Sequence, residues 1–161
     1  MALNRLRNVT CIPAAIAATE GTARLYHVLS PVPCSSSLSL DFMRDAQALT
    51  SSVVPVFTLD RLLRDAGVSH VDLVKIDTES TEPQVLEGMR GVLERDHPFI
   101  VCEVLEGRGS ERAVEQILGD LGYRFYLLTP DGPSIRGSVT GHRDWLNYLF
   151  TTLTPEDVAL L

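Results

Sequence analysis

Cysteine is scarce in this chain of 161 residues, which contains only Cys11, Cys34 and Cys102. Their number is odd, they lie far apart, and no CxxC pair or neighbouring histidine gives zinc-ligand spacing. A disulfide scaffold and a cysteine-based zinc site are therefore excluded. Cys11 and Cys102 lie in short apolar runs, so we expect buried free thiols in a reducing, cytoplasmic compartment.

Positive charge and long apolar runs are lacking as well. The net charge is −7, which argues against nucleic acid as a main partner because there is no basic surplus to neutralise phosphates. No run approaches the roughly 18 apolar residues of a membrane span, and no apolar signal core follows the N-terminus. A hydrophobic content of 45% with 22% charged residues is ordinary for a globular protein. We expect residues 1–161 to form one cytoplasmic domain with no membrane partner.

The most structured stretch is residues 71–103. It begins with a short apolar run at 71–76, typical of a strand buried on both faces. Thr81 is placed to cap a helix that His97-Pro98 ends, because the residue before proline disfavours the α region. A second apolar run follows at 99–104. The pattern predicts a βαβ unit with two parallel strands, whose chemistry lies at the carboxyl ends of those strands.

The flanking segments predict further elements around this unit. Strands are expected at 9–12, 22–28, 53–57, 123–128 and 147–152, with helices at 58–65 and 110–121. Serine-rich residues 30–52 and residues 134–145 are expected to be loops, the latter after a turn at 130–133. The predicted fold class is α/β, with a mostly parallel sheet and an antiparallel closing element.

Acidic residues gather at the predicted strand ends. Asp77 and Glu79 follow the first strand, and Glu103 ends the second. These carboxylates either act on a ligand or simply favour the N-terminus of the next helix, and the second reading suits Glu82 in its first turn. Three scattered carboxylates define no coordination pattern, so we assign no metal. Lys75, inside the strand, is expected to extend its ammonium group to a carboxylate or to the sheet rim.

One run of residues carries a family resemblance. LVKIDTESTEPQVLEGMRGVLERDHPFIVCEV resembles the core motif of FkbM-type methyltransferases, which runs K-I-D-x-E-G, then a glutamate, V/L-L-x-G, and P-x-x-x-x-E. Asn8-Val9 with Pro13-Ala14-Ala15, Thr58-Leu59-Asp60 and Leu121-Gly122-Tyr123 are similar to further pieces of the family pattern, in the same order. The resemblance covers nearly the whole chain.

The resemblance implies a Rossmann-like fold and transfer of a methyl group from S-adenosyl-L-methionine to a hydroxyl oxygen of a sugar, polyketide or similar small-molecule acceptor. Such transfer needs alignment of the acceptor oxygen and removal of its proton. On this basis Asp77 and Glu79 are the predicted catalytic residues. Ala14 and Ala15 are small enough for an adenine ring to approach, unless they serve only local packing. Glu103 and His142 are assigned to acceptor binding, although His142 also fits a plain surface loop.

The sequence departs from the family in two ways. Ser80 replaces the glycine after the KIDxE glutamate, which puts the loop geometry in question because glycine adopts left-handed backbone most readily. No GxGxG turn for the cofactor's carboxylate end occurs in the chain. The first two strands of the family sheet are therefore expected to be missing, with a gap between the runs at 9–12 and 71–76, and the chain is expected to be a truncated, C-terminal part of the domain.

Two alternatives remain open from the sequence. The missing cofactor turn also suits a non-catalytic fragment, either an interaction module that self-associates or part of a split enzyme. An unrelated α/β enzyme that handles phosphates or nucleotide sugars would need a phosphate cradle or a basic pocket, and the sequence shows neither.

Overall fold

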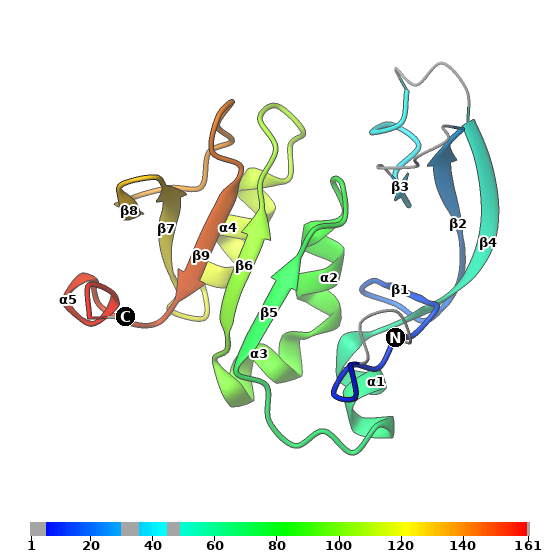
Figure 1. Ribbon diagram of the computed structural model, residues 1–161, viewed down its shortest axis with the longest axis horizontal. Coiled ribbons are helices and arrows are strands. Elements are labelled where there is room, and N and C mark those ends of the chain that lie inside the picture. Colours follow the sequence, from blue (N-terminus) through cyan, green and yellow to red (C-terminus); the bar gives the residue numbers. More distant parts are fainter. Residues whose placement is uncertain (1–5, 30–35, 45–48, 161) are drawn as a thin grey trace.

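The computed structural model describes residues 6–29, 36–44 and 49–160, in which two β-sheets and five helices form (Figure 1). The first sheet has the strand order β1-β4-β2-β3, and the second has the order β5-β6-β9-β7-β8. Within these ranges, no helix combines the length and apolar character needed to cross a bilayer. Cys34 lies outside the described residues.

The first sheet is built on a long antiparallel pair. Its strands are β1 (Ala15–Ile16), β2 (Gly21–Val28), β3 (Ser36–Ser37) and β4 (Leu49–Phe57). Pairing of β2 with β4 runs from Gly21 opposite Val56 to Val28 opposite Leu49, which confirms the strands predicted at 22–28 and 53–57. The loop predicted at 30–52 is wrong where β4 begins and where β3 forms. Polar serines extend there because a neighbouring strand satisfies their backbone hydrogen bonds.

The strand predicted at 9–12 is wrong. Val9 and Ile12 are 41% and 46% exposed, and Cys11 is exposed rather than buried. The chain pairs a few residues later, where Ala15 and Ile16 lie parallel to Val56 and Phe57. An apolar run becomes a strand only where a partner edge is available, and the sequence does not show where that edge lies.

The second sheet contains the predicted βαβ unit. Its strands are β5 (Leu73–Ile76), β6 (Phe99–Glu103), β7 (Arg124–Thr129), β8 (Gly132–Arg136) and β9 (Asn147–Thr151). β5 and β6 are parallel and in register from Leu73 opposite Phe99, as predicted. β9 inserts between β6 and β7 and is antiparallel to both, and β8 is antiparallel to β7.

A mostly parallel sheet is therefore the wrong description, because antiparallel pairs predominate in both sheets. Only two residues, Pro130 and Asp131, connect β7 to β8, and a connection that short can join only antiparallel strands. The loop predicted at 134–145 is also wrong at its start, where β8 forms. Pro133 conceals this strand in the sequence, but proline is tolerated on an edge strand such as β8.

Helices cover one face of the second sheet (Figure 1). These helices are α2 (Glu82–Gly88), α3 (Arg90–Asp96) and α4 (Glu111–Gly119). Two further helices, α1 (Leu59–Asp65) after β4 and α5 (Pro155–Val158) near the C-terminus, lie outside this layer (Figure 1). The single helix predicted after Thr81 is two helices, because Met89 between them leaves the helical region at φ −118° and ψ 18°. Thr58 caps α1 as predicted, by accepting a hydrogen bond from the N–H of Arg61. Thr81 makes no such cap, since its hydroxyl donates to the carbonyl of Thr78.

The core lies between the second sheet and α2, α3 and α4. Ile76, Ile100 and Phe150 point to this side and are at most 2% exposed. On the opposite face Leu73 is 59% exposed, so the prediction of a strand buried on both faces is wrong. Alternate residues of β5 face a side that no described helix covers (Figure 1).

A glycine in α2 lets the first sheet approach the second. A Cβ added at Gly88 would lie 2.2 Å from the carbonyl oxygen of Ala17, in the turn between β1 and β2. Only a residue without a side chain fits this approach. The "L-E-G" sequence at the end of α2 thus sets how closely β1 can lie to the helix layer.

Candidate functional site

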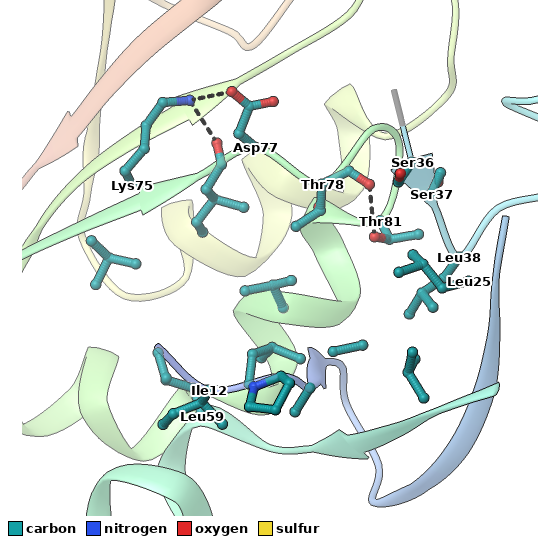
Figure 2. Close-up of a pocket in the computed structure, with 18 residues that line it drawn as sticks. Ile12, Leu25, Ser36, Ser37, Leu38, Leu59, Lys75, Asp77, Thr78 and Thr81 are labelled. Carbon is teal, nitrogen blue, oxygen red and sulfur yellow. Dashed lines mark hydrogen bonds and ion pairs between the residues drawn. The ribbon is translucent and has the colours of Figure 1, made fainter. Parts of the chain in front are cut away.

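A cavity of about 590 Å³ lies between the first sheet and the free edge of β5 (Figure 2). Its walls come from β1, β2, β3, β4, β5, α1 and α2, and they are mainly apolar. The polar side chains on its wall are those of Ser36, Ser37, Lys75, Asp77, Thr78 and Thr81. An enclosed apolar space with a few convergent polar groups is the usual form of a small-molecule site.

Small residues line the cavity at its N-terminal wall. Ala14 and Ala15 lie side by side there, after a turn in which the N–H of Ala14 donates to the carbonyl of Ile12 at 2.9 Å. Pairing of Ala15 with Val56 fixes this segment against β4. Because neither alanine extends beyond its Cβ, the wall leaves room for a flat ligand group.

Asp77 lies at the carboxyl end of β5, on the rim of the same cavity. Lys75 donates from Nζ to Oδ2 of Asp77 at 3.2 Å and to the carbonyl of Ile76 at 3.1 Å (Figure 2). The Asp77 side chain remains 54% exposed and that of Lys75 44% exposed. The ammonium group thus reaches a carboxylate at the sheet rim, as predicted, and Asp77 keeps an oxygen for hydrogen bonds to a ligand.

Hydrogen bonds to a buried carboxylate fix the loop after Asp77. Glu82 is 3% exposed, and its Oε1 accepts hydrogen bonds from the N–H of Thr78, the hydroxyl of Thr78 and the N–H of Ser80, at 3.0 to 3.3 Å. The sequence assigned Glu82 only to the first turn of a helix. Its larger role is to fix the loop that follows β5. The family pattern contains this glutamate, but nothing in the sequence shows that its side chain turns back to the loop.

The same loop has left-handed backbone at two consecutive residues. Glu79 has φ 56° and Ser80 has φ 79°, a conformation that costs a residue with a side chain roughly 1–2 kcal/mol. Ser37 of β3 donates its hydroxyl to the carbonyl of Glu79 at 2.7 Å and accepts from the N–H of Ser39 at 2.9 Å. The strained loop is therefore held by Glu82 within the second sheet's helix layer and by Ser37 of the first sheet.

The sequence comparison decides the family. A family model described as Methyltransferase FkbM domain matches residues 2–125. The chain belongs to the FkbM methyltransferase family. Methyl transfer is thus the chemistry that its family indicates. Searches of curated proteins and of solved structures gave no match.

The FkbM motif of this chain has Ser80 in place of the family's glycine, and the structure shows which backbone conformation Ser80 adopts. Ser80 stands where the family pattern has glycine, and it adopts the left-handed conformation that glycine would take without strain. A left-handed residue thus occurs at this position although the residue is not glycine. The predicted residues Ala14, Ala15 and Asp77 line one cavity, although Asp77 is far from the two alanines in the sequence.

Glu79 and Glu103 follow or end the strands next to this cavity but do not line its wall. Burial raises the pKa of Glu79 above its usual range, and the charges of Asp77 and Glu82 add to the rise. Burial likewise raises the pKa of Glu103, again with contributions from Asp77 and Glu79. The acidic groups at the carboxyl ends of β5 and β6 therefore share one electrostatic environment, as their positions in the βαβ unit predicted.

His142 has a local structural role in the loop before β9. Its Nδ1 accepts from the N–H groups of Asp144 and Trp145 at 3.1 and 3.2 Å, and its ring stacks on Trp145 with 4.5 Å between centroids. It lines none of the described cavities. Its assignment to acceptor binding stays a prediction, as does that of Glu103.

The carboxylates near the cavity form no metal-binding cluster among the described residues. Across the part of the chain that the structure describes, no group of three or more His, Cys, Asp or Glu side chains is arranged to hold a metal ion. Glu82, the best-placed buried carboxylate, is already engaged by three protein donors.

Proposed function

We propose that this chain binds S-adenosyl-L-methionine in the cavity between its sheets and transfers a methyl group to a hydroxyl oxygen of a small-molecule acceptor. Membership of the FkbM family supports the reaction class. The observation that carries the proposal is that Ala14, Ala15 and Asp77 line one cavity.

The residues on the cavity wall suit the adenosyl part of this cofactor. A volume of about 590 Å³ lies within the usual range for small-molecule sites. The two alanines leave space for the adenine ring, and the Asp77 carboxylate is a natural acceptor for ribose hydroxyl groups. When bound, S-adenosyl-L-methionine supplies a methyl group activated by its sulfonium charge.

The other steps, positioning of a hydroxyl group and removal of its proton, are assigned to carboxylates of the chain. Lys75 fixes the orientation of Asp77 at the rim, which lets Asp77 position a hydroxyl group. Glu79, whose pKa is raised by burial and by neighbouring acids, is a stronger base than an exposed glutamate. It is the group best suited to accept the proton that the acceptor hydroxyl loses.

Calorimetric titration with S-adenosylhomocysteine tests the binding half of this proposal. We expect saturable binding together with a higher melting temperature. Asp77→Asn is expected to weaken binding by about tenfold or more, since a hydrogen bond to a charged group is lost. Asp131→Asn, in the exposed turn between β7 and β8, is the matched control and should bind like the parent chain.

A second variant blocks the space itself. Ala14→Leu is expected to abolish binding while leaving the melting temperature near that of the parent, because Ala14 lies outside the strands. Equal binding by Ala14→Leu and the parent would show that the cofactor lies elsewhere.

The alternative function is an interaction module or one part of a split enzyme of the same fold. The absence of a GxGxG turn and the exposed Leu73 on the uncovered face of β5 favour it. No binding of S-adenosylhomocysteine by the folded chain, together with self-association in sedimentation, would favour this alternative over methyl transfer by the chain alone.

A further inference from the structure

A second hollow, of about 390 Å³, lies on the other side of the loop that follows β5. Ser39, Phe42, Ser80, Gly107 and Arg108 line it, together with the exposed ion pair of Asp41 and Arg44. We call this hollow the arginine cleft. In contrast to the cavity between the sheets, most of its wall is polar, so it suits a different kind of chemical group.

Two glycines present Arg108 to the arginine cleft. Gly107 and Gly109 have φ 71° and φ 79°, so the backbone turns through left-handed conformations on both sides of Arg108. The N–H of Gly107 donates to Oε1 of Glu111 at 3.1 Å, which ties this turn to the start of α4. The Gly-Arg-Gly segment is therefore a built turn that displays one cationic side chain.

Phe42 orients the guanidinium group of Arg108. The Cζ atom of Arg108 lies 5.0 Å from the centre of the Phe42 ring, within the range of a cation–π contact. This contact limits the position of the guanidinium group over the ring and leaves its N–H donors available to a ligand, because an aromatic face accepts no conventional hydrogen bond from them here. A planar fork of donors held in this way matches the oxygens of carboxylate, phosphate or sulfate.

Two donors at the arginine cleft are still unused. Among the described residues, Arg108 forms no ion pair. The Oγ atom of Ser80 is buried and makes no hydrogen bond with any described group. A buried hydroxyl group without a partner is costly, and the residue that carries it lies on the wall of the cleft.

The arginine cleft and the cavity between the sheets share one wall. Ser37 and Thr78 line the cavity, whereas Ser39 and Ser80, each two residues further along, line the cleft. The hydrogen bond from Ser37 to the carbonyl of Glu79 crosses this wall. The charge of Arg108 also acts on Glu79, since it opposes the rise in the pKa of that carboxyl group.

We propose that the arginine cleft binds an anionic group (a carboxylate, phosphate or sulfate) carried by the methyl acceptor, with Arg108 as the residue that selects it. The identification of the bound molecule as the acceptor rests on the proposed function. Anion binding itself does not, because it follows from Arg108, Phe42 and Ser80 alone. An acceptor held by its anionic end in the cleft would extend its hydroxyl-bearing part toward the wall at Glu79.

The test follows amide chemical shifts of the ¹⁵N-labelled chain during titration with inorganic phosphate, sulfate, acetate and neutral glycerol. We expect at least one anion to bind saturably and to shift the amides of Ser39, Ser80, Gly107 and Arg108. Stronger binding of acetate would identify a carboxylate, and stronger binding of phosphate or sulfate a tetrahedral anion. Shifts confined to other residues, or equal effects of glycerol, would overturn the proposal.

Three variants sharpen this test. Arg108→Gln should weaken anion binding by about tenfold or more, and Arg108→Lys should weaken it less, because lysine keeps the charge but loses the fork. Arg136→Gln, which removes an exposed arginine from the edge strand β8, should bind like the parent. Unchanged binding by Arg108→Gln contradicts the proposal.

Parallel titrations with S-adenosylhomocysteine separate this inference from the proposed function. Anion binding that depends on Arg108, without binding of S-adenosylhomocysteine, would retain the anion site and refute the cofactor site. Binding of S-adenosylhomocysteine without any anion effect would support the cofactor site and refute the anion site.

Discussion

The carboxylate of Asp60 in α1 caps the N-terminus of α3 by accepting a hydrogen bond from the N–H of Gly91 at 2.8 Å. Its second oxygen accepts from the N–H of Val92 at 2.9 Å. A Cβ at Gly91 would lie 2.9 Å from the nearer oxygen, so the glycine permits this approach. The Thr-Leu-Asp segment that resembles the family pattern thus has a physical role: it joins α1 to α3, 31 residues later.

Asp60→Ala is expected to destabilise the chain by about 1–2 kcal/mol, because two N–H groups at the start of α3 lose their acceptor. Urea unfolding followed by circular dichroism measures the change. Asp65→Ala is the control, since among the described residues Asp65 pairs only with Arg61 on the exposed face of the same helix. Loss of such an exposed pair should cost less than loss of the cap. Equal effects of the two variants would contradict the cap.

Gly88→Ala is expected to destabilise the chain by about 1–3 kcal/mol, since the new methyl group would overlap the carbonyl of Ala17 and force β1 away from α2. Gly119→Ala is the matched control. It also lies in a helix, where the nearest atom to a new Cβ is the Cζ of Phe125 at an ordinary 3.7 Å. There the same change should be neutral or stabilising. Melting temperatures of both variants, compared with that of the parent, measure these effects. Equal melting temperatures of the two variants would contradict the close approach at Gly88.

Ser80→Gly is expected to stabilise the chain by about 0.5–1 kcal/mol. Glycine relieves the left-handed strain at φ 79° and removes a buried hydroxyl group without a partner. The greater freedom of glycine in the unfolded chain offsets part of this gain. Ser134→Gly in β8, where φ is not left-handed, should instead destabilise. A loss of stability in Ser80→Gly would mean that the serine side chain contributes more than the strain costs.

Asp96 is expected to make the free energy of unfolding depend on pH in the acidic range. Its side chain is 3% exposed and receives hydrogen bonds from Arg95, at 2.6 and 2.7 Å, and from the N–H of Val71 at 3.0 Å. The hydrogen bonds from Arg95 are the main cause that lowers its pKa to about 2. Because the folded-state pKa lies below the unfolded value of about 3.9, the stabilisation is complete above pH 4 and is lost as the pH falls toward 2.

Asp96→Asn is therefore expected to be less stable than the parent at pH 6, and the difference should shrink as the pH approaches 2. Urea unfolding of both proteins at pH 6, 4 and 2.5 measures it. Asp72→Asn is the control, because Asp72 is 90% exposed and pairs only with His70 among the described residues. A constant difference between Asp96→Asn and the parent across this range would show that the ionised carboxylate is not the stabilising form.

Local signals explain the parts of the fold that were predicted. Short apolar runs located β5 and β6, helical apolar spacing located α4, and Thr58 marked the start of α1. Local signals could not predict the order of strands in each sheet, since β9 pairs on both sides with strands that lie far from it in the sequence. The prediction of a mostly parallel sheet failed because pairing direction depends on these distant partners.

The candidate site likewise has features that the sequence indicated and features that only the fold brought together. The sequence by itself determined the carboxylates at the end of β5, the glycines at 88 and 91, and the family to which they belong. Only the tertiary structure brought Ala14 and Asp77 to one cavity, buried Glu82 beneath the loop and placed the guanidinium group of Arg108 over the Phe42 ring. The physical reason is the sequence distance over which each feature is determined. Local spacing fixes which residues share a strand end or a helix face, whereas a cavity depends on where separate elements pack. That packing is set by contacts between residues far apart in the chain.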